Sequence, residues 1–268
     1  MKTRIISGAV LFAILIPTLI IGGNLLLVLL CIVSCGGIYE LSKVFKQEKT
    51  LLMLAAMAAN VFLYAGMVLI KEIYFIVELV VFFLFILVCY VIEYPKFKLN
   101  DAVVPLLAFV YAGVLMSYIY RIRMNDSGLY LVWLIFIASW LCDTCAYFSG
   151  VTLGKHKAFP VLSPKKTWEG CIGGVLGATI VGTAFAAIFA DKIDVFKYPV
   201  PAVAIIVFFS SILSIFGDLA ASAIKRENNI KDYSNLIPGH GGIMDRFDSV
   251  IFVSPVIFYL INVFEKIM

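Results

Sequence analysis

Charged residues are scarce in this chain: Asp, Glu, Lys and Arg make up 14% of its 268 residues, against about 25% in a typical soluble domain. Apolar residues make up 63%, which is more than a soluble core of this size can bury. These proportions exclude a soluble enzyme and a disordered chain. The apolar runs are continuous and about 20 residues long, which excludes a transmembrane β-barrel. The sequence therefore predicts an all-α, polytopic integral membrane protein.

Cysteine and histidine are also rare, with six and two residues. Neither type clusters at the spacing of a zinc site. All six cysteines lie in or at the ends of apolar runs, where buried thiols are expected and disulfides are not. Cys142 and Cys145 form a C-x-x-C pair, but on a predicted helix and without the βαβ context of a redox motif. We expect six free thiols with no redox or metal role.

Nine apolar runs are long enough to cross a bilayer. They cover roughly residues 5–21, 25–44, 51–70, 74–92, 103–120, 129–149, 170–190, 200–221 and 247–264. A short break at Gly22 and Gly23 predicts a helical hairpin, with one interrupted segment as the alternative. The segments on one side carry 15 of the 21 Lys and Arg residues. The positive-inside rule places that side, with the N-terminus, in the cytoplasm. The net charge of +4 is then a topology signal, and we expect no nucleic-acid partner.

Polar residues are distributed unevenly and divide the chain into two predicted regions. We expect residues 1–125 to form a scaffold of apolar spans that offers dimer contacts. Glu78 is the only ionisable residue that we expect well inside those spans, and we interpret it as a helix–helix partner or an outer-leaflet group. Residues 126–268 hold both histidines and the two longest inner loops, about residues 150–169 and 222–245. We expect the catalytic region there, with both loops facing the cytoplasm.

The seventh run carries a small residue at every fourth position. These residues are Gly170, Gly174, Ala178, Gly182, Ala186 and Ala190. Such a stripe lets another helix backbone approach closely, which is how many membrane helices pack. We expect this stripe to be structural.

Four polar residues follow one another at helical spacing from the end of the eighth run: Asp218, Ser222, Lys225 and Arg226. They share one face if that helix continues past the membrane surface. A carboxylate at the edge of the hydrocarbon is costly unless it is paired or bound to a metal ion. A phosphate-binding or metal-binding face is therefore expected at this helix end.

A Gly-rich segment follows Lys231 and leads into the ninth run. Its His240, Gly241 and Gly242 form a stretch whose backbone N–H groups suit an anion. The start of the ninth run then carries three charged residues, Asp245, Arg246 and Asp248. An Asp at a helix start either caps the helix or holds a cation, and the sequence leaves both open.

The other inner loop brings a second set of cations. It contains Ser163, Lys165 and Lys166, and it follows a helix face that begins at Asp143 and continues through Tyr147, Gly150 and Gly154. Carboxylate oxygens suit Mg²⁺, and Lys, Arg and loop N–H groups suit polyphosphate. Together the two loops predict metal-assisted phosphoryl or nucleotidyl transfer at the membrane surface. Taken singly, each cation could instead be a topology signal or a lipid-headgroup contact.

The segment from residue 222 to residue 248 resembles the signature of the phosphatidate cytidylyltransferases, or CDP-diacylglycerol synthases. The matching stretches are Ser222-Ala-Ile-Lys225-Arg226, Lys231-Asp232-Tyr-Ser234 and Ile237-Pro238-Gly-His240-Gly241-Gly242-Ile-Met-Asp245-Arg246-Phe-Asp248. The segments 163–170 and 143–147 are also similar to family motifs. The resemblance covers roughly residues 140–250, while residues 1–125 agree only in being apolar spans.

This resemblance implies a reaction in which CTP and phosphatidic acid give CDP-diacylglycerol and pyrophosphate, with Mg²⁺ required. It implies an enzyme of the inner membrane, a homodimer with its site facing the cytoplasm. Asp218 and Asp245 are the expected metal ligands, and a second cation, K⁺ or another divalent ion, stays open. The expected catalytic residues are Asp143, Lys166, Lys225, His240, Arg246 and Asp248. The expected substrate-binding residues are Ser163, Lys165, Ser222, Arg226, Lys231, Gly241 and Gly242.

Two other functions remain as alternatives. A CTP-dependent polyprenol or phytol kinase would transfer the γ-phosphate to an alcohol and release CDP. An ion-coupled transporter or channel would place its charges near the middle of the bilayer, whereas these charges gather at one interface. The signature at residues 222–248 favours the cytidylyltransferase.

Overall fold

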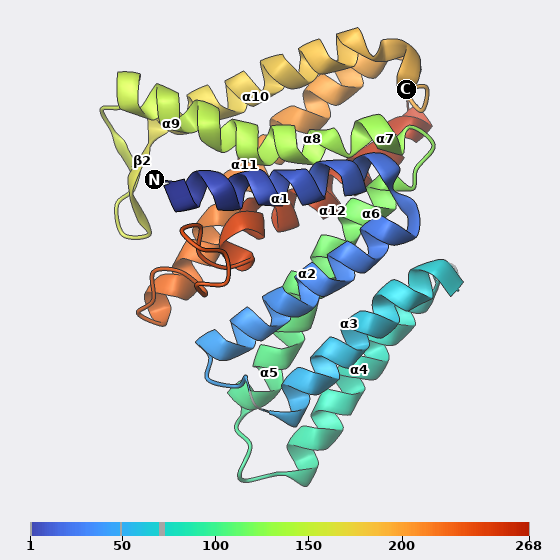
Figure 1. Ribbon diagram of the computed structural model, residues 1–268, viewed down its shortest axis with the longest axis vertical. Helices are drawn as coiled ribbons and strands as arrows, with labels where there is room; N and C mark the ends of the chain where they lie inside the picture. The colour runs from blue at the N-terminus through green and yellow to red at the C-terminus, as the bar shows by residue number, and fades with distance from the viewer. Residues whose placement is uncertain (1, 49, 70–72, 268) are drawn as a thin grey trace. The chain divides into compact units, whose positions relative to one another are not determined.

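The computed structural model describes residues 2–48, 50–69 and 73–267, and most of them are helical (Figure 1). Seven helical segments in the described chain are long and apolar enough to cross a membrane. The described apolar parts of two more helices, Ile6–Ile21 and Ile76–Ile92, are shorter. These nine segments correspond to the nine predicted runs, and the predicted all-α, polytopic architecture is confirmed. The predicted end of the third run, at residue 70, lies outside the described residues.

The first four helices are α1 (Lys2–Ile21), α2 (Gly23–Val44), α3 (Leu51–Leu69) and α4 (Ile73–Ile92). The fifth segment combines α5 (Leu99–Ala108), the π-helical turn η1 (Phe109–Val114) and α6 (Leu115–Arg123). The sixth combines α7 (Gly128–Leu131), α8 (Trp133–Phe136), the π-helical turn η2 (Ile137–Leu141) and α9 (Cys142–Leu153). The last three are α10 (Trp168–Ile188), with the 3₁₀ turn η3 (Ala190–Lys192) after it, α11 (Pro199–Glu227) and α12 (Met244–Ile267).

Two predicted details of these helices are confirmed. Gly22 separates α1 from α2, and its φ of 69° lies in the left-handed region that glycine adopts easily, so the predicted hairpin forms. Helix α11 continues to Glu227, so the polar residues from Asp218 to Arg226 do lie on one helix. All six cysteines are free thiols.

The loop after α9 contains a short feature that helical periodicity did not predict. Strands β1 (Lys157–Phe159) and β2 (Ser163–Thr167) pair antiparallel, with Lys157 opposite Thr167. This hairpin is polar and follows Gly154, where α9 ends. His156 Nδ1 lies 2.6 Å from Glu169 Oε1, which ties the hairpin base to the start of α10.

The chain forms two compact units, and we describe each by itself. The first comprises Met1–Ser117 and Asp232–Asp245, and in it α2 packs against α3, α5 and η1. Its core includes the fully buried Tyr64 and Phe109. Within this core Asn60 Nδ2 donates to Ser34 Oγ at 2.8 Å, a polar contact that joins α3 to α2. Such contacts join membrane helices without hydrophobic driving force.

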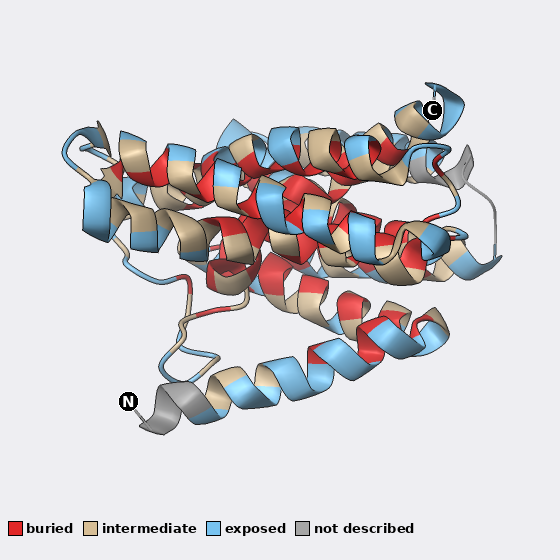
Figure 2. Cartoon of the chain, turned by 90° about the horizontal axis from the view of Figure 1, so that it is seen from above, coloured by how far each residue is buried: buried red, intermediate tan, exposed pale blue. Residues whose placement is uncertain are grey.

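The second unit comprises Tyr118–Lys231 and Arg246–Met268, and in it α10 packs against both α9 and α11. The buried face of α10 includes the predicted small residues from Gly170 to Ala186, which confirms the stripe as a packing surface. A Cβ on Gly174 would lie 2.8 Å from Cys142 O, so only glycine fits there without a shift. Figure 2 shows buried residues as stripes along the helices, while the outward faces remain exposed. Those outward faces are apolar, as lipid contact requires.

Candidate active site

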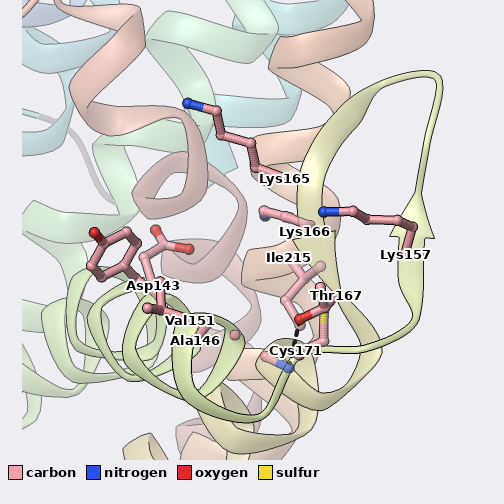
Figure 3. Close-up of a pocket in the computed structure, with 13 residues that line it drawn as sticks. Asp143, Ala146, Val151, Lys157, Lys165, Lys166, Thr167, Cys171 and Ile215 are labelled. Atoms are coloured by element: carbon pink, nitrogen blue, oxygen red, sulfur yellow. Dashed lines mark hydrogen bonds between the residues drawn. The ribbon is translucent and has the colours of Figure 1, made fainter.

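A cavity of about 480 Å³ opens in the second unit between α9, the strand hairpin and the start of α10. Asp143 on α9 lines it, as do Lys157 on β1 and both Lys165 and Lys166 on β2 (Figure 3). The predicted helix face is confirmed here, because Tyr147, Gly150 and Gly154 line the same cavity as Asp143. A hairpin with three lysines opposite a helix with a carboxylate forms a positively charged pocket that suits a polyanion.

The floor of the cavity at α10 depends on small residues and a helix cap. Thr167 Oγ1 accepts a hydrogen bond from Gly170 N at 3.2 Å, which caps the start of α10. A Cβ on Gly170 would lie 2.9 Å from Ala146 O, and a Cβ on Gly154 would lie 2.7 Å from Thr167 Oγ1. The glycines therefore let the hairpin and α9 approach α10 closely enough to close the pocket.

Lys166 connects this cavity with α11. Its Nζ lies 2.5 Å from Asp218 Oδ2, and both side chains are largely buried. Burial alone would lower the pKa of Lys166, but the carboxylates of Asp218 and Asp143 together raise it above its ordinary value. Lys166 is therefore a fixed positive charge at neutral pH, and it contacts one of the two carboxylate oxygens of Asp218, the predicted metal ligand.

Three carboxylates gather around this ion pair from different helices. Asp143, Asp218 and Asp248 lie within electrostatic range of one another, and Lys225 lies within range of Asp248. The side chain of Ser249 hydrogen-bonds Asp143, and Ser249 N donates to Asp248 Oδ1 at 2.8 Å. The structure thus brings together five of the predicted site residues, and the cluster holds more acids than bases.

The composition of this cluster fits a hard divalent cation. In the described part of the chain, no three His, Cys, Asp or Glu side chains form a metal-binding group. Mg²⁺ does not need such a group, because it is usually held by one or two carboxylates together with water and substrate phosphates. A buried excess of carboxylates is costly without a cation. Asp218, with Asp143 or Asp248 nearby, could therefore hold one Mg²⁺ beside a bound polyphosphate.

Arg246 in the first turn of α12 offers a second anion contact. Its backbone oxygen accepts a hydrogen bond from Trp140 Nε1 at 3.1 Å, which ties α12 to η2. Its Nε is buried, and within the described chain no hydrogen-bond acceptor reaches it. Because a buried charged donor without an acceptor is costly, this geometry suits a ligand with phosphate oxygens.

The Gly-rich loop before α12 belongs to the first unit and is held by its own carboxylate. Asp245 Oδ2 accepts hydrogen bonds from Tyr233 N at 2.8 Å and from Gly242 N at 2.9 Å. Both donors precede α12, which begins at Met244, so these bonds hold the loop in front of the helix, and the capping role that the sequence left open stays a prediction. The roles predicted for Asp245 as a metal ligand and for Gly242 as a substrate contact remain predictions, and Asp218 and Asp245 lie in different units.

His240 lies in the same loop and contacts α1. Ser7 Oγ donates to Pro238 O at 2.9 Å and lies 2.7 Å from His240 Nδ1. A hydroxyl has a single proton, so when Ser7 donates it to Pro238 the imidazole must donate from Nδ1. The contact with Ser7 fixes the orientation of the imidazole ring.

Comparisons with known proteins identify the family of this chain. The profile of the cytidylyltransferase family matches residues 2–264. The chain belongs to the cytidylyltransferase family. It is accordingly a nucleotidyltransferase, as the resemblance at residues 222–248 predicted.

Named relatives of this cytidylyltransferase come from several bacteria. A protein named phosphatidate cytidylyltransferase from Bacillus subtilis is 36% identical over 192 residues, which is 70% of this chain and 69% of that protein. Proteins of the same name from Staphylococcus saprophyticus and Staphylococcus haemolyticus are 40% and 38% identical. Each of those two alignments covers 65% of this chain and 64% of the relative, slightly less than two thirds of the relative's length.

The remaining predicted residues of this cytidylyltransferase lie outside the cluster around Lys166. Ser163 lies half-buried at the start of β2, and Ser222 is half-buried on α11. Arg226 and Lys231 are exposed at and beyond the end of α11. Gly241 has a φ of 84°, and a Cβ there would lie 2.7 Å from Asp245 Oδ2. Their predicted contacts with substrate remain predictions.

Sequence reasoning missed two residues of this site region. Lys157 lines the cavity but was counted only as an inner cation, because a lysine in a loop carries no other signal. Glu40 on α2 is 1% exposed although it lies near the end of its span, and the sequence singled out only Glu78 among the ionisable residues of the first spans. Glu40 lies one turn from the end of its helix, where the sequence alone suggests contact with water. It is buried only because other elements pack against it in the tertiary structure.

Proposed function

We propose that this enzyme transfers CMP from CTP to phosphatidic acid, giving CDP-diacylglycerol and pyrophosphate in a Mg²⁺-dependent reaction. Membership of the cytidylyltransferase family and the names of the relatives support the substrate pair. The observation that carries the proposal is the cavity in which Lys157, Lys165 and Lys166 face Asp143, with the Lys166–Asp218 ion pair beside it. A lysine-rich pocket next to a carboxylate cluster suits a nucleoside triphosphate and its metal ion.

The chemistry needs charge control more than a strong base. Phosphatidic acid is already an anionic nucleophile, so the main barrier is the repulsion between two polyanions. The lysines of the hairpin and Arg246 would bind the phosphates, hold the α-phosphorus in line with the lipid phosphate, and stabilise the departing pyrophosphate. Mg²⁺ at Asp218 would neutralise charge on the triphosphate and polarise its phosphoryl oxygens. Asp143 and Asp248 would orient the cations, and His240, in the loop of the first unit, stays a predicted catalytic residue.

The proposal includes the setting of the enzyme. Both loops and the cavity would face the cytoplasm, where CTP is present, and the excess of Lys and Arg on that side of the membrane supports this orientation. The apolar outward faces of the helices let phosphatidic acid enter from the bilayer. We also propose a homodimer, with the first unit offering the contacts.

The test uses purified full-length enzyme in detergent with phosphatidic acid, Mg²⁺ and CTP labelled at either the α- or the γ-phosphorus. We expect the α-label to enter the lipid phase and the γ-label to leave as pyrophosphate. Chelation with EDTA should stop the reaction, and added Mg²⁺ should restore it. Asp218→Asn should lower turnover about 100-fold or more, while Asp126→Asn, an exposed control in a loop, should not. Transfer of the γ-label to lipid would instead indicate a kinase, and no lipid label at all would refute the proposal.

A further inference from the structure

Glu40 is a buried carboxylate, and its hydrogen-bond partners among the described residues lie in the loop before α12 or at the start of that helix. Ser234 Oγ donates to Glu40 Oε1 at 2.5 Å, and Ile243 N donates to the same oxygen at 2.9 Å. Met244 N donates to Glu40 Oε2 at 2.9 Å. Met244 begins α12, so Glu40 satisfies backbone donors that a helix start leaves without internal partners.

The surface of α2 is shaped to receive this loop. A Cβ on Gly37 would lie 3.0 Å from Met244 Sδ, and a Cβ on Gly36 would collide with the end of the Ile243 side chain. On the loop side, a Cβ on Gly242 would lie 2.5 Å from Glu40 Oε1. Glycines on both partners therefore let the backbone of the loop reach the carboxylate directly.

The position of Glu40 is unfavourable for α2 taken alone. It lies in the last turns of α2 (Gly23–Val44), where the helix dipole disfavours an acid, and burial in a membrane helix adds a further cost. The start of α12 offsets both costs, because its N–H groups and its dipole favour a negative charge. The hydrogen bonds from the loop and from the start of α12 are therefore what stabilises a charged carboxylate at this position of α2.

Glu40 and Asp245 each accept hydrogen bonds from a different part of the loop. Asp245 accepts from Gly242 N and Glu40 accepts from Ile243 N and Met244 N, so three consecutive N–H groups point at two carboxylates. This sets the direction in which the chain enters α12. The next residues of that helix include Arg246 and Asp248, which lie just after Asp245 in the first turns of α12.

We propose that Glu40 is a positioning residue for the transfer reaction, acting through the loop and the first turn of α12 and not by contact with substrate. This inference rests on the proposed function. Glu40→Gln keeps the size of the side chain but converts an acceptor oxygen into an N–H donor. At least one of the three donors then loses its partner, and the loop loosens while the cavity in the second unit keeps its residues.

The experiment compares full-length Glu40→Gln, Ser234→Ala and Glu78→Gln with the wild type in detergent. Glu78→Gln is the matched control, because Glu78 is a half-buried acid of another helix in the same unit, α4, with no role in the site. Steady-state kinetics give kcat and the KM for CTP. Hydrogen–deuterium exchange of peptides covering residues 232–246, and thermal unfolding, report on structure without any need for activity.

We expect Glu40→Gln to lower kcat about 10–100-fold and to change the KM for CTP less than about threefold. Hydrogen–deuterium exchange should become faster in residues 232–246 and stay unchanged in α10 and α11. Ser234→Ala should lower kcat about fivefold, and Glu78→Gln should match the wild type. Wild-type kcat and exchange in Glu40→Gln would overturn the inference, as would a lower unfolding temperature with unchanged kcat per folded molecule. If Glu40→Gln does not fold, wild-type kcat and exchange in Ser234→Ala overturn it. A wild type that transfers no CMP refutes the proposed function, while the exchange data still decide whether Glu40 holds the loop.

Discussion

At the scale of single residues, Lys166 illustrates how burial and charge act together. Desolvation opposes its charge, but Asp218 at 2.5 Å and the nearby Asp143 favour that charge more strongly. Removing the ammonium would leave the partly buried Asp218 beside other carboxylates without this partner. Such a group costs about 1–3 kcal/mol of stability. Lys166 therefore supports the fold as well as the proposed phosphate binding.

We predict that Lys166→Met lowers kcat about 100-fold, since a fixed cation near the transferring phosphorus is lost, and lowers the unfolding temperature. Lys96→Met, at an exposed loop position, is the control and should change neither. Steady-state kinetics and thermal unfolding in detergent measure both effects. A variant with wild-type kcat would remove Lys166 from the site.

The pH dependence of this effect has a definite sign. The folded-state pKa of Lys166 is raised above its ordinary value of 10.5, so its stabilising contribution is complete below that value and is lost as the pH rises through the folded-state pKa. The difference in unfolding temperature between wild type and Lys166→Met should therefore stay constant between about pH 7 and 9. A difference that shrinks over this range would contradict the raised pKa.

At the scale of elements, α10 is the helix whose packing face the sequence predicted best. The four-residue spacing of small side chains predicted a packed face, and the buried residues of α10 follow it. The adjoining strand hairpin could not be predicted in the same way. It is short and polar, and it is stabilised by contacts such as His156 with Glu169, which are 13 residues apart.

Packing along α10 gives an element-scale prediction. Gly174→Ala would place a Cβ 2.8 Å from both Cys142 O and Ala146 Cβ, so α9 and α10 must separate. We expect a loss of about 1–3 kcal/mol, measured as a lower unfolding temperature. Gly66→Ala on α3 is the matched control, because nothing lies within 4 Å of its added Cβ. That variant should be neutral or stabilised by up to about 1 kcal/mol.

At the scale of the whole molecule, the charge distribution predicts the orientation of every loop. Val161→Cys, at the 85% exposed tip of the strand hairpin, should lie inside the cell. Asp191→Cys, in the exposed turn after α10, should lie outside. In intact spheroplasts we expect a membrane-impermeant maleimide to label residue 191 only, and in lysed membranes both positions. The wild-type chain gives the background, and labelling of residue 161 in intact spheroplasts would reverse the topology.

The amino-acid sequence by itself determined the membrane class, the positions of the helices and the family. Apolar runs, glycine breaks and a dense charged signature are local features, so they can be recognised in the sequence without knowledge of the tertiary structure. Asp218 and Asp143 were also recognisable, since a carboxylate in an apolar segment is conspicuous in any sequence.

The tertiary structure alone decided which groups meet. Helix packing, which no sequence periodicity encodes, brings together residues that are far apart in the chain. Lys166 pairs with Asp218, 52 positions away, and Glu40 pairs with Met244, 204 positions away. Glu40 resembles an ordinary interfacial acid until α2 and the Gly-rich loop enclose it. Burial and partner choice are properties of the assembled helices, because the cost of a charge depends on everything packed around it.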